Sequence, residues 1–265
     1  MRDKSMAGSP FNLLERIAGK VNKRLYRPDV KVSAGTSLRR AGTAYGGWVF
    51  EDRPSLRGGW IISCGLGEDA SFDVEMANGP GAAILIVDPT PRAIAHFQEI
   101  AGRLGCPSQR GYVHGGKQPP ESCDLSNVGR GQMVLEPQAL WTESAPVRFH
   151  KPANPDNVSN SITFSAGGAD DFILVPATTL NEILARYAIS SVAMLKMDIE
   201  GAEVDILKSI ASWQILPEQI LVEFDVLRDA GPVSKKAVEE VDAMLRAQGF
   251  ACVNVEDKNY TYVRS

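Results

Sequence analysis

Leu195-Lys196-Met197-Asp198-Ile199-Glu200-Gly201-Ala202-Glu203 follows an apolar run and opens a helical pattern. Three carboxylates therefore gather where a buried strand ends and a helix begins. Ligands of open α/β sheets bind at such strand ends, and a buried carboxylate without a partner costs several kcal/mol. The stretch therefore predicts a binding site. The alternative is a helix cap, in which Asp198 or Glu200 accepts hydrogen bonds from free N–H groups while Glu203 is solvated.

The chain has 265 residues, 44% hydrophobic and 23% charged, which is enough for one large domain with extensions. Its formal net charge of −4 argues against nucleic-acid binding, which requires a basic face. The four cysteines lie far apart without a CxxC spacing, so they predict neither a zinc site nor a disulfide framework and fit a reducing compartment. No apolar stretch reaches the roughly 20 residues of a membrane span, and the N-terminus lacks a signal core. We therefore expect a soluble, cytoplasmic protein.

Residues 1–28 are rich in basic residues and carry apolar residues at helical spacing. A basic amphipathic helix of this kind can lie on an anionic membrane. More often it packs on its own domain or on a partner subunit, so a peripheral membrane contact and a homo-oligomer both stay open. Residues 29–58 alternate short strand-like pieces with Gly and Pro and predict no clear element. We therefore expect 1–58 to be an extension with a helical start and an irregular remainder.

From residue 59 to residue 265, strand-like and helix-like segments alternate, which is typical of parallel strands joined by crossover helices. The last two strands are joined so tightly that they must be antiparallel. Segment 105–131 is too long for an ordinary connection and predicts an active-site lid or a disordered loop, and an insertion spans about 142–170. The predicted strands are 60–64, 83–87, 133–136, 191–197, 219–224, 251–255 and 260–264, with an inserted ribbon of 147–150 and 161–164. The predicted helices are 71–78, 91–104, 179–187, 202–211 and 235–248.

The first of these strands runs into Cys64-Gly65-Leu66-Gly67-Glu68-Asp69-Ala70, whose glycines allow a ligand to approach the backbone. The two glycines and Ala70 match the G-x-G-x-x-A form of the dinucleotide fingerprint. Asp88 ends the second strand, where an acid can accept hydrogen bonds from ribose hydroxyls. A pyrophosphate at this helix start would meet two like charges, whereas S-adenosylmethionine is a nucleoside with a sulfonium cation and no phosphate. An NAD(P)-dependent oxidoreductase that uses the same glycines is the alternative.

The nine-residue stretch, followed by Ile206-Leu207, resembles the signature of FkbM-type S-adenosylmethionine-dependent methyltransferases. Supporting segments extend the resemblance over residues 60 to about 225. The resemblance implies a class I methyltransferase fold, which is a Rossmann-like α/β sheet, mostly parallel, with an antiparallel C-terminal hairpin. The supporting segments are Asp88-Pro89-Thr90-Pro91, Gln138-Ala139-Leu140-Trp141, Val158-Ser159-Asn160-Ser161 and Val175-Pro176-Ala177-Thr178-Thr179-Leu180.

The resemblance also implies which residues bind the cofactor, and it places Asp198 near the methyl donor. The chain departs from the family pattern at two positions. Cys64 stands where the family often has an acid, so the charge that holds the methionine amino group would come from Glu68 or Asp198. Asp225 replaces a histidine, which removes a base at that position. The resemblance implies that Gly65, Gly67 and Asp88 hold the cofactor and that Ala139 and Leu140 lie beside adenine. The full set of residues that we assign to the cofactor is Cys64, Gly65, Gly67, Glu68, Asp88, Pro89, Ala139, Leu140 and Asp198.

Methyl transfer to a sugar hydroxyl needs a base, because the hydroxyl pKa lies far above neutral. Asp198, Glu200 and Glu223 are candidates since all three follow strands on one sheet edge. Asp198 is favoured, and its alternative role is to bind the methionine amino group or cap the helix. Lys196 points to the same strand face and is expected to pair with Asp198. His150, in the insertion, is a further candidate base. Three acids suit Mg²⁺ or Ca²⁺, but their spacing matches no metal loop, and no metal is assigned.

These features predict an enzyme that transfers a methyl group from S-adenosylmethionine to a hydroxyl of a sugar, glycan or natural-product acceptor. The fold and the cofactor motif do not choose the acceptor. A membrane-associated binding module that keeps the fold without turnover is the non-enzymatic alternative.

Overall fold

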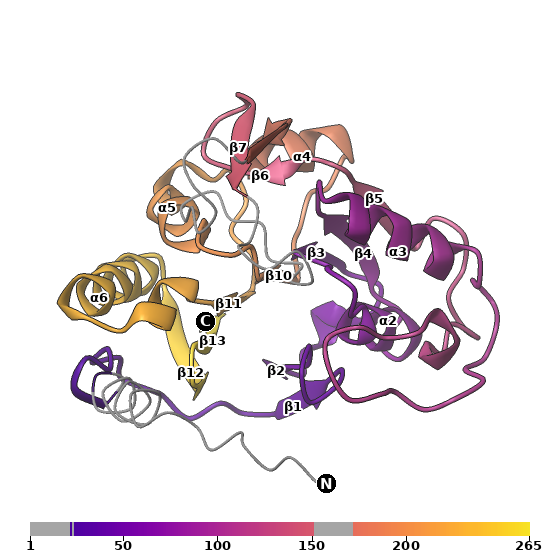
Figure 1. Ribbon diagram of the computed structural model, residues 1–265. Helices are drawn as coiled ribbons and strands as arrows, with labels where there is room; N and C mark the ends of the chain where they lie inside the picture. Colours follow the sequence, from indigo (N-terminus) through magenta and orange to yellow (C-terminus); the bar gives the residue numbers. More distant parts are fainter. Residues whose placement is uncertain (1–21, 23, 151–171) are drawn as a thin grey trace, which may run out of the picture.

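A seven-stranded sheet forms the centre of the computed structural model, which describes residues 22, 24–150 and 172–265 (Figure 1). The strand order is β12-β13-β11-β10-β3-β4-β5. The strands β5, β4, β3, β10 and β11 are parallel to one another, and β13 pairs antiparallel with both β11 and β12. The predicted mostly parallel sheet with its antiparallel C-terminal hairpin is therefore confirmed. The strands are β3 (Trp60–Cys64), β4 (Ala83–Val87), β5 (Met133–Glu136), β10 (Met194–Met197), β11 (Gln219–Glu223), β12 (Phe250–Glu256) and β13 (Asn259–Arg264).

Two hydrophobic cores lie on opposite faces of the sheet, because successive side chains of a strand point to opposite faces. Ile62 and Leu195 join the core on the first face, whereas Ile61 and Met194 join the core on the second face. The central strands are continuous apolar runs for this reason. The first face is covered by α4 (Leu180–Arg186), α5 (Glu203–Lys208) and α6 (Pro232–Ala247), and the second by α2 (Ser71–Asn78) and α3 (Pro91–Ala101).

Most predicted elements are present with small shifts at their ends. Helix α3 begins at Pro91 as predicted, but it ends before Gly102 rather than at residue 104. Helix α4 begins after Thr179, whose side chain accepts a hydrogen bond from the Glu182 N–H in a capping box. The helix predicted at 202–211 is divided into α5 and the short 3₁₀ helix η3 (Ile210–Ser212). The other 3₁₀ helices are η1 (Pro54–Leu56), η2 (Pro120–Ser122) and η4 (Asp225–Asp229).

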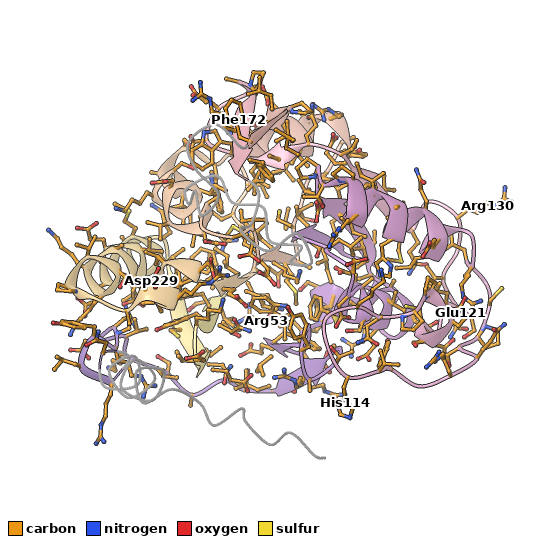
Figure 2. The ribbon with its side chains drawn as sticks, in the orientation of Figure 1. Arg53, His114, Glu121, Arg130, Phe172 and Asp229 are labelled. Carbon is orange, nitrogen blue, oxygen red and sulfur yellow. The ribbon has the colours of Figure 1, made fainter. Side chains whose placement is uncertain are left out.

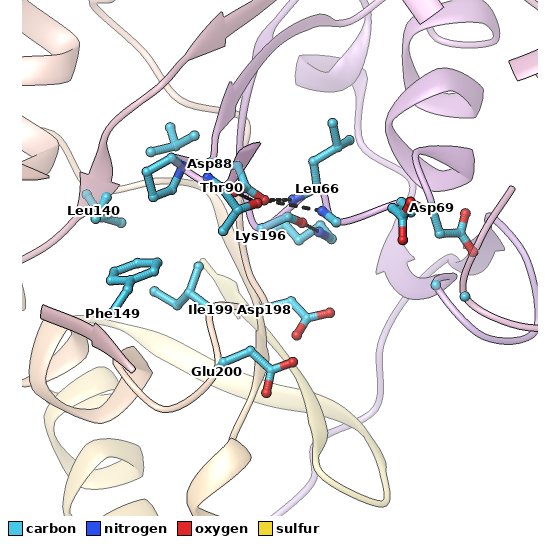
Figure 3. Close-up of a pocket in the computed structure, with 18 of the residues that line it drawn as sticks. Leu66, Asp69, Asp88, Thr90, Leu140, Phe149, Lys196, Asp198, Ile199 and Glu200 are labelled. Atoms are coloured by element: carbon cyan, nitrogen blue, oxygen red, sulfur yellow. Dashed lines mark hydrogen bonds between the residues drawn. The ribbon is translucent and has the colours of Figure 1, made fainter. Parts of the chain in front are cut away.

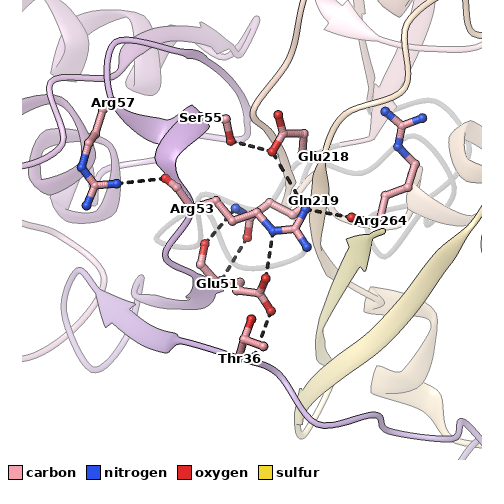
Figure 4. Close-up of polar contacts among 8 residues, drawn as sticks. All are labelled: Thr36, Glu51, Arg53, Ser55, Arg57, Glu218, Gln219 and Arg264. Carbon is pink, nitrogen blue, oxygen red and sulfur yellow. Dashed lines mark hydrogen bonds and ion pairs between the residues drawn. The ribbon is translucent and has the colours of Figure 1, made fainter.

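An antiparallel hairpin of β1 (Leu38–Ala41) and β2 (Trp48–Glu51), for which the sequence predicted no element, packs across β11 and β13. Gln219 is fully buried in β11 and exchanges two hydrogen bonds with the main chain of Glu51. The Glu51 N–H donates to Gln219 Oε1 (3.1 Å), and Gln219 Nε2 donates to the Glu51 carbonyl (3.0 Å). Arg53 extends this network to the Glu51 carboxylate and to the Arg264 carbonyl (Figure 4). These polar contacts fix the hairpin on the sheet.

The long segment 105–131, for which the sequence left a lid and a disordered loop open, forms an ordered loop, and its role at the active site stays a prediction. It contains η2 and buries Cys123 and Leu125 in the core of the second face. Figure 2 shows His114, Glu121 and Arg130 on the outer side of this loop. The loop is therefore anchored by apolar side chains and presents polar side chains outward.

Short strand pairs complete the described part of the chain. β6 (Ala139–Leu140) pairs in parallel with β9 (Ala177–Thr178), and β7 (Val147–His150) pairs antiparallel with β8 (Phe172–Val175). The predicted partner of 147–150, residues 161–164, lies outside the described residues. Most of the basic segment 1–28 lies outside them as well, and the boundary at residue 58 stays a prediction. Within the described ranges, no helix has the length and apolar character to cross a membrane.

The bond between Gln219 and Glu51 can be tested by the substitution Gln219→Leu. The variant leaves the buried N–H and carbonyl of Glu51 without partners, and each such group costs about 1–3 kcal/mol. We expect the free energy of unfolding, measured by urea denaturation, to fall by about 2 kcal/mol or more. The control Gln109→Leu lies at an exposed loop position and should change it by about 0.5 kcal/mol or less. Equal losses in the two variants would contradict this account.

Candidate active site

A pocket opens at the carboxyl ends of β3, β4 and β10, which are neighbours in the sheet. The chain leaves β3 toward β4 and β5 and later returns to place β10 on the other side of β3. This reversal is a topological switch point, where open α/β sheets bind ligands. Asp88 follows β4 and Asp198 follows β10, and both line the pocket (Figure 3). The acids that the sequence assigned to one site are thus brought together.

The tips of β3 and β10 are in direct contact. Gly65 has a φ of +85°, and a Cβ atom at this position would lie 1.8 Å from the Asp198 carbonyl oxygen. The Asp198 N–H donates to the Cys64 carbonyl (3.0 Å), and Lys196 Nζ donates to the Gly65 carbonyl (2.8 Å). Only glycine satisfies both the backbone conformation and this approach. The contact therefore holds Asp198 beside the glycine turn.

Asp88 fastens the glycine turn to the end of β4. Its buried Oδ2 accepts hydrogen bonds from the N–H groups of Leu66 (2.9 Å) and Gly67 (3.2 Å). Its Oδ1 accepts from the Thr90 N–H (2.9 Å) and from Thr90 Oγ1 (2.7 Å). A carboxylate has about four acceptor positions, and these donors occupy all of those of Asp88. A ribose hydroxyl that binds here would have to replace one of these donors.

The pocket has an apolar end and an acidic end. In Figure 3, Leu140, Phe149 and Ile199 lie toward one end, while the carboxylates of Asp198 and Glu200 point toward the other. A flat apolar ring is stabilised at the first end by contact with aliphatic and aromatic side chains. A cation is stabilised at the second end. The pocket therefore suits an elongated ligand that is apolar at one end and positively charged at the other.

Asp198 is partly exposed at the acidic end. Burial, followed by the negative charges of Glu223 and Glu200, raises the pKa of Asp198 to about 7, although Lys196 and Lys258 act in the opposite direction. The predicted ion pair with Lys196 does not form, because Lys196 Nζ bonds to the Gly65 carbonyl and lies 5.7 Å from the centre of the Trp48 ring. Among the described residues, no hydrogen bond or ion pair holds the Asp198 carboxylate. This group is therefore available to a ligand.

The two glutamates among the candidate bases are held by cations. Glu200 pairs with Arg228 (2.8 Å), and Glu223 forms a close ion pair with Lys258. Asp225 joins the two pairs, because its Oδ1 lies 2.8 Å from Arg228 Nη2 and 2.8 Å from Lys258 Nζ. Glu200 lines the pocket, whereas Glu223 lies beside it and acts on Asp198 through its charge. Within the described ranges, no group of three or more His, Cys, Asp or Glu side chains is arranged to hold a metal ion.

Glu203 is the acid that stabilises the turn after β10, which differs from the alternative that the sequence left open, a cap formed by Asp198 or Glu200. It is 1% exposed rather than solvated, and its carboxylate accepts hydrogen bonds from the N–H groups of Ile199 and Gly201, each at 3.1 Å. Between these donors Glu200 adopts a φ of +57°, a left-handed conformation that costs non-glycine residues energy. Glu203 therefore holds the strained turn that directs Asp198 and Glu200 toward the pocket.

The comparison with protein families agrees with this geometry. Residues 41–252 match the methyltransferase FkbM domain, which is most of the chain. The chain belongs to the FkbM methyltransferase family. No protein of curated function matches the sequence. Among solved structures, the fibrillarin pre-rRNA processing protein of Methanococcus jannaschii matches with a TM-score of 0.40 and 12% identity, over 89% of this chain and 86% of that chain.

In this FkbM domain, nearly all the residues assigned to the cofactor line the pocket. Cys64 is fully buried at the end of β3 and is not part of the lining. His150 ends β7, and its side chain lies outside the described part of the structure. The roles of all these residues stay predictions. The assigned residues that line the pocket are Gly65, Gly67, Glu68, Asp88, Pro89, Ala139, Leu140 and Asp198.

Other residues of the FkbM domain line the pocket without having been assigned to it from the sequence, and those with the largest side chains come from three elements. Tyr45 and Trp48 come from the β1–β2 hairpin, Phe149 from β7, and Lys196 from β10. Of these residues, only Lys196 could have been assigned from the sequence, because a lysine inside an apolar strand must find a partner. The two hairpin residues could not, since their place depends on how the hairpin packs.

The pH dependence of stability tests the position of Glu203. Burial is the largest influence and raises the pKa of Glu203 to about 8, although N–H donors lower it. An acid with a raised pKa stabilises the fold fully below its ordinary pKa and loses that contribution as the pH rises through the folded value. We therefore expect the free energy of unfolding of the wild type to fall, relative to that of Glu203→Gln, between about pH 5 and about pH 8.

The matched variant Glu203→Ala removes the acceptor altogether. It should be less stable than Glu203→Gln by about 1–3 kcal/mol at every pH, because buried N–H groups lose their partner. Urea denaturation at several pH values measures both effects. Parallel pH profiles for the wild type and Glu203→Gln would show that Glu203 does not titrate as described.

Proposed function

We propose that this methyltransferase uses S-adenosylmethionine and methylates a hydroxyl group of a sugar, glycan or natural-product acceptor. The observation that carries the proposal is the position of the Asp198 carboxylate, which lies at the acidic end of the pocket beside the glycine turn. Its charge suits a cationic cofactor, and its pKa suits a base that works near neutral pH.

The pocket fits the cofactor at both ends. Adenine would lie against Leu140 and Phe149, and the ribose would lie beside Asp88 and replace one of its present donors. The methionine part would extend toward Glu68 and Asp198. S-adenosylmethionine supplies an electrophilic methyl group on a sulfonium centre. A pyrophosphate in the same place would meet the negative charges of the acidic end, which argues against NAD(P).

Asp198 would take the proton of the acceptor hydroxyl as the methyl group moves. A base is most effective when its pKa lies near the working pH, and the pKa of Asp198 is about 7. The ion pairs with Arg228 and Lys258 would hold the Glu200 and Glu223 carboxylates in place. Burial of the site would exclude water and strengthen these charges.

The charge of Asp198 should make cofactor binding depend on pH. S-adenosylmethionine and S-adenosylhomocysteine share an amino group and differ in the charge on sulfur, so the ratio of their affinities isolates the sulfonium. Because Asp198 becomes ionised as the pH rises through about 7, we expect this ratio to shift toward S-adenosylmethionine by up to about tenfold between about pH 6 and about pH 8.

Isothermal titration calorimetry measures both affinities. Asp198→Asn should remove the pH dependence and abolish turnover while S-adenosylhomocysteine still binds. A pH-independent ratio in the wild type, or near-normal turnover in the variant, would contradict the role of Asp198. Binding of NAD without any affinity for S-adenosylhomocysteine would favour an oxidoreductase.

Asp88→Ala tests the ribose position. The variant should weaken S-adenosylhomocysteine binding by roughly 1–3 kcal/mol, the cost of hydroxyl groups without an acceptor. The matched variant Thr90→Val removes the Oγ1 donor and frees one acceptor position on Asp88, so it should bind the ligand at least as tightly as the wild type. If calorimetry finds that both variants lose affinity equally, Asp88 acts by fastening the turn rather than by binding ribose.

A further inference from the structure

The turn between β1 and β2 is fastened to the turn that follows β3. Thr43 Oγ1 donates to Asp69 Oδ2 (2.7 Å), and the Thr43 N–H donates to Ser71 Oγ (2.9 Å). The Gly46 N–H donates back to Thr43 Oγ1 (2.9 Å), and a Cβ atom at Gly46 would lie 2.7 Å from Asp69 Oδ2. These contacts determine the path of the main chain on both sides of Tyr45. The position of this residue at the pocket is therefore set by the backbone.

The long loop 105–131 reaches Tyr45 from the other side. Lys117 Nζ pairs with Glu68 Oε1 (2.7 Å), which ties the loop to the turn after β3. A Cβ atom on the neighbouring Gly116 would lie 2.4 Å from Tyr45 Cε1, so the ring lies directly against the Gly116 main chain. Two segments that are far apart in the sequence are thus fixed to the same turn and meet at the pocket.

Tyr45 remains largely solvent-exposed, with 69% of its surface accessible, although it lines the pocket. Partial burial, followed by the negative charges of Asp198, Glu200 and Glu223, raises the pKa of the Tyr45 phenol, although Lys258 acts in the opposite direction. The ring therefore stays neutral, with its hydroxyl near the acidic end and one side open. An exposed aromatic ring of this kind offers an apolar surface together with a hydrogen-bonding group.

The charges around Tyr45 determine which acceptors can approach it. Cations already hold Glu200 and Glu223, while the Asp198 carboxylate contributes its charge to the pocket. An acceptor hydroxyl can donate a hydrogen bond to such a carboxylate. A phosphate or carboxylate on the acceptor would instead be repelled at short range.

We propose that Tyr45 is the residue that determines acceptor specificity, because its ring would stack on the apolar face of an uncharged cyclic polyol while the neighbouring carboxylates exclude anionic acceptors. This inference rests on the proposed function. The β1–β2 turn and Gly116 would then line one side of the acceptor site. Tyr45 acts on the acceptor, whereas the adenine of the cofactor would lie at the apolar end of the pocket and its methionine part would extend toward Glu68 and Asp198.

The test uses the full-length protein with isotope-labelled S-adenosylmethionine and a panel of neutral methyl glycosides, matched with the corresponding uronic acids and sugar phosphates. We expect transfer to neutral glycosides and little or none to the anionic partners. Tyr45→Ala should raise the KM for the glycoside about three- to tenfold, with a smaller change in kcat. Tyr45→Phe keeps the ring and should retain most of the affinity for the glycoside.

S-adenosylhomocysteine binding, measured by calorimetry, separates the two levels of the hypothesis. Both Tyr45 variants should still bind it, with a change in affinity smaller than the change in the glycoside KM, which also shows that they fold. Gly116→Val, which displaces the Tyr45 ring, should raise the glycoside KM in the same way as Tyr45→Ala. Saturation-transfer NMR with the neutral glycosides should detect their binding to the wild-type complex with S-adenosylhomocysteine, and this binding should weaken in Tyr45→Ala.

Three outcomes would overturn the inference while the proposed cofactor stands. They are equal transfer to neutral and anionic acceptors, an unchanged KM in Tyr45→Ala, and binding of S-adenosylhomocysteine without binding or methylation of any neutral glycoside. Failure of the wild-type protein to bind S-adenosylhomocysteine or S-adenosylmethionine would instead overturn the proposed function itself.

Discussion

The contact between Gly65 and the carbonyl of Asp198 is the constraint on which the pocket depends. A Cβ atom at Gly65 would lie 1.8 Å from that oxygen. The tips of β3 and β10 can therefore meet only because glycine has no side chain. Lys196 reinforces the contact by bonding to the Gly65 carbonyl, and Trp48 covers Lys196 from the β1–β2 hairpin. The hairpin is in turn held by Gln219. The hydrogen bonds of Gln219 and Lys196 therefore both help to hold the tips of β3 and β10 together.

The carboxylates at the carboxyl ends of the strands differ in their burial and in the partners that surround them. Glu200 and Glu223 have cationic partners, while Glu203 is buried and bound to main-chain N–H groups. Asp198 has neither kind of partner among the described residues, and burial with two like charges nearby raises its pKa to about 7. Environments that drive the pKa values of neighbouring acids apart are a common way to give them different roles. Glu203 is engaged by the turn that it holds, so Asp198 is the acid with a raised pKa that faces the pocket.

The sequence was sufficient for the elements whose signal is local. Apolar runs such as 83–87 predicted the central strands, and Asp88 and Asp198 were placed together because both follow parallel strands. The β1–β2 hairpin was missed because its position depends on Gln219, 168 residues from Glu51 in the sequence. The choice between Glu203 and its neighbouring acids as the cap depended on the left-handed conformation of Glu200, which residue types alone do not specify.

The hydrogen bonds of Asp88 indicate where cofactor affinity would come from. The N–H groups of the glycine turn already have a partner in Asp88, so the turn holds its shape through bonds within the protein. A ribose hydroxyl at this acid would exchange one hydrogen bond for another, which contributes little net free energy. The gain would then arise at the two ends of the pocket, where Leu140 and Phe149 offer apolar contact and Asp198 offers charge. In such a pocket, Asp88 would position the ligand. The apolar contacts and the charge at the two ends would determine how tightly the ligand binds and how strongly the pocket prefers a cation.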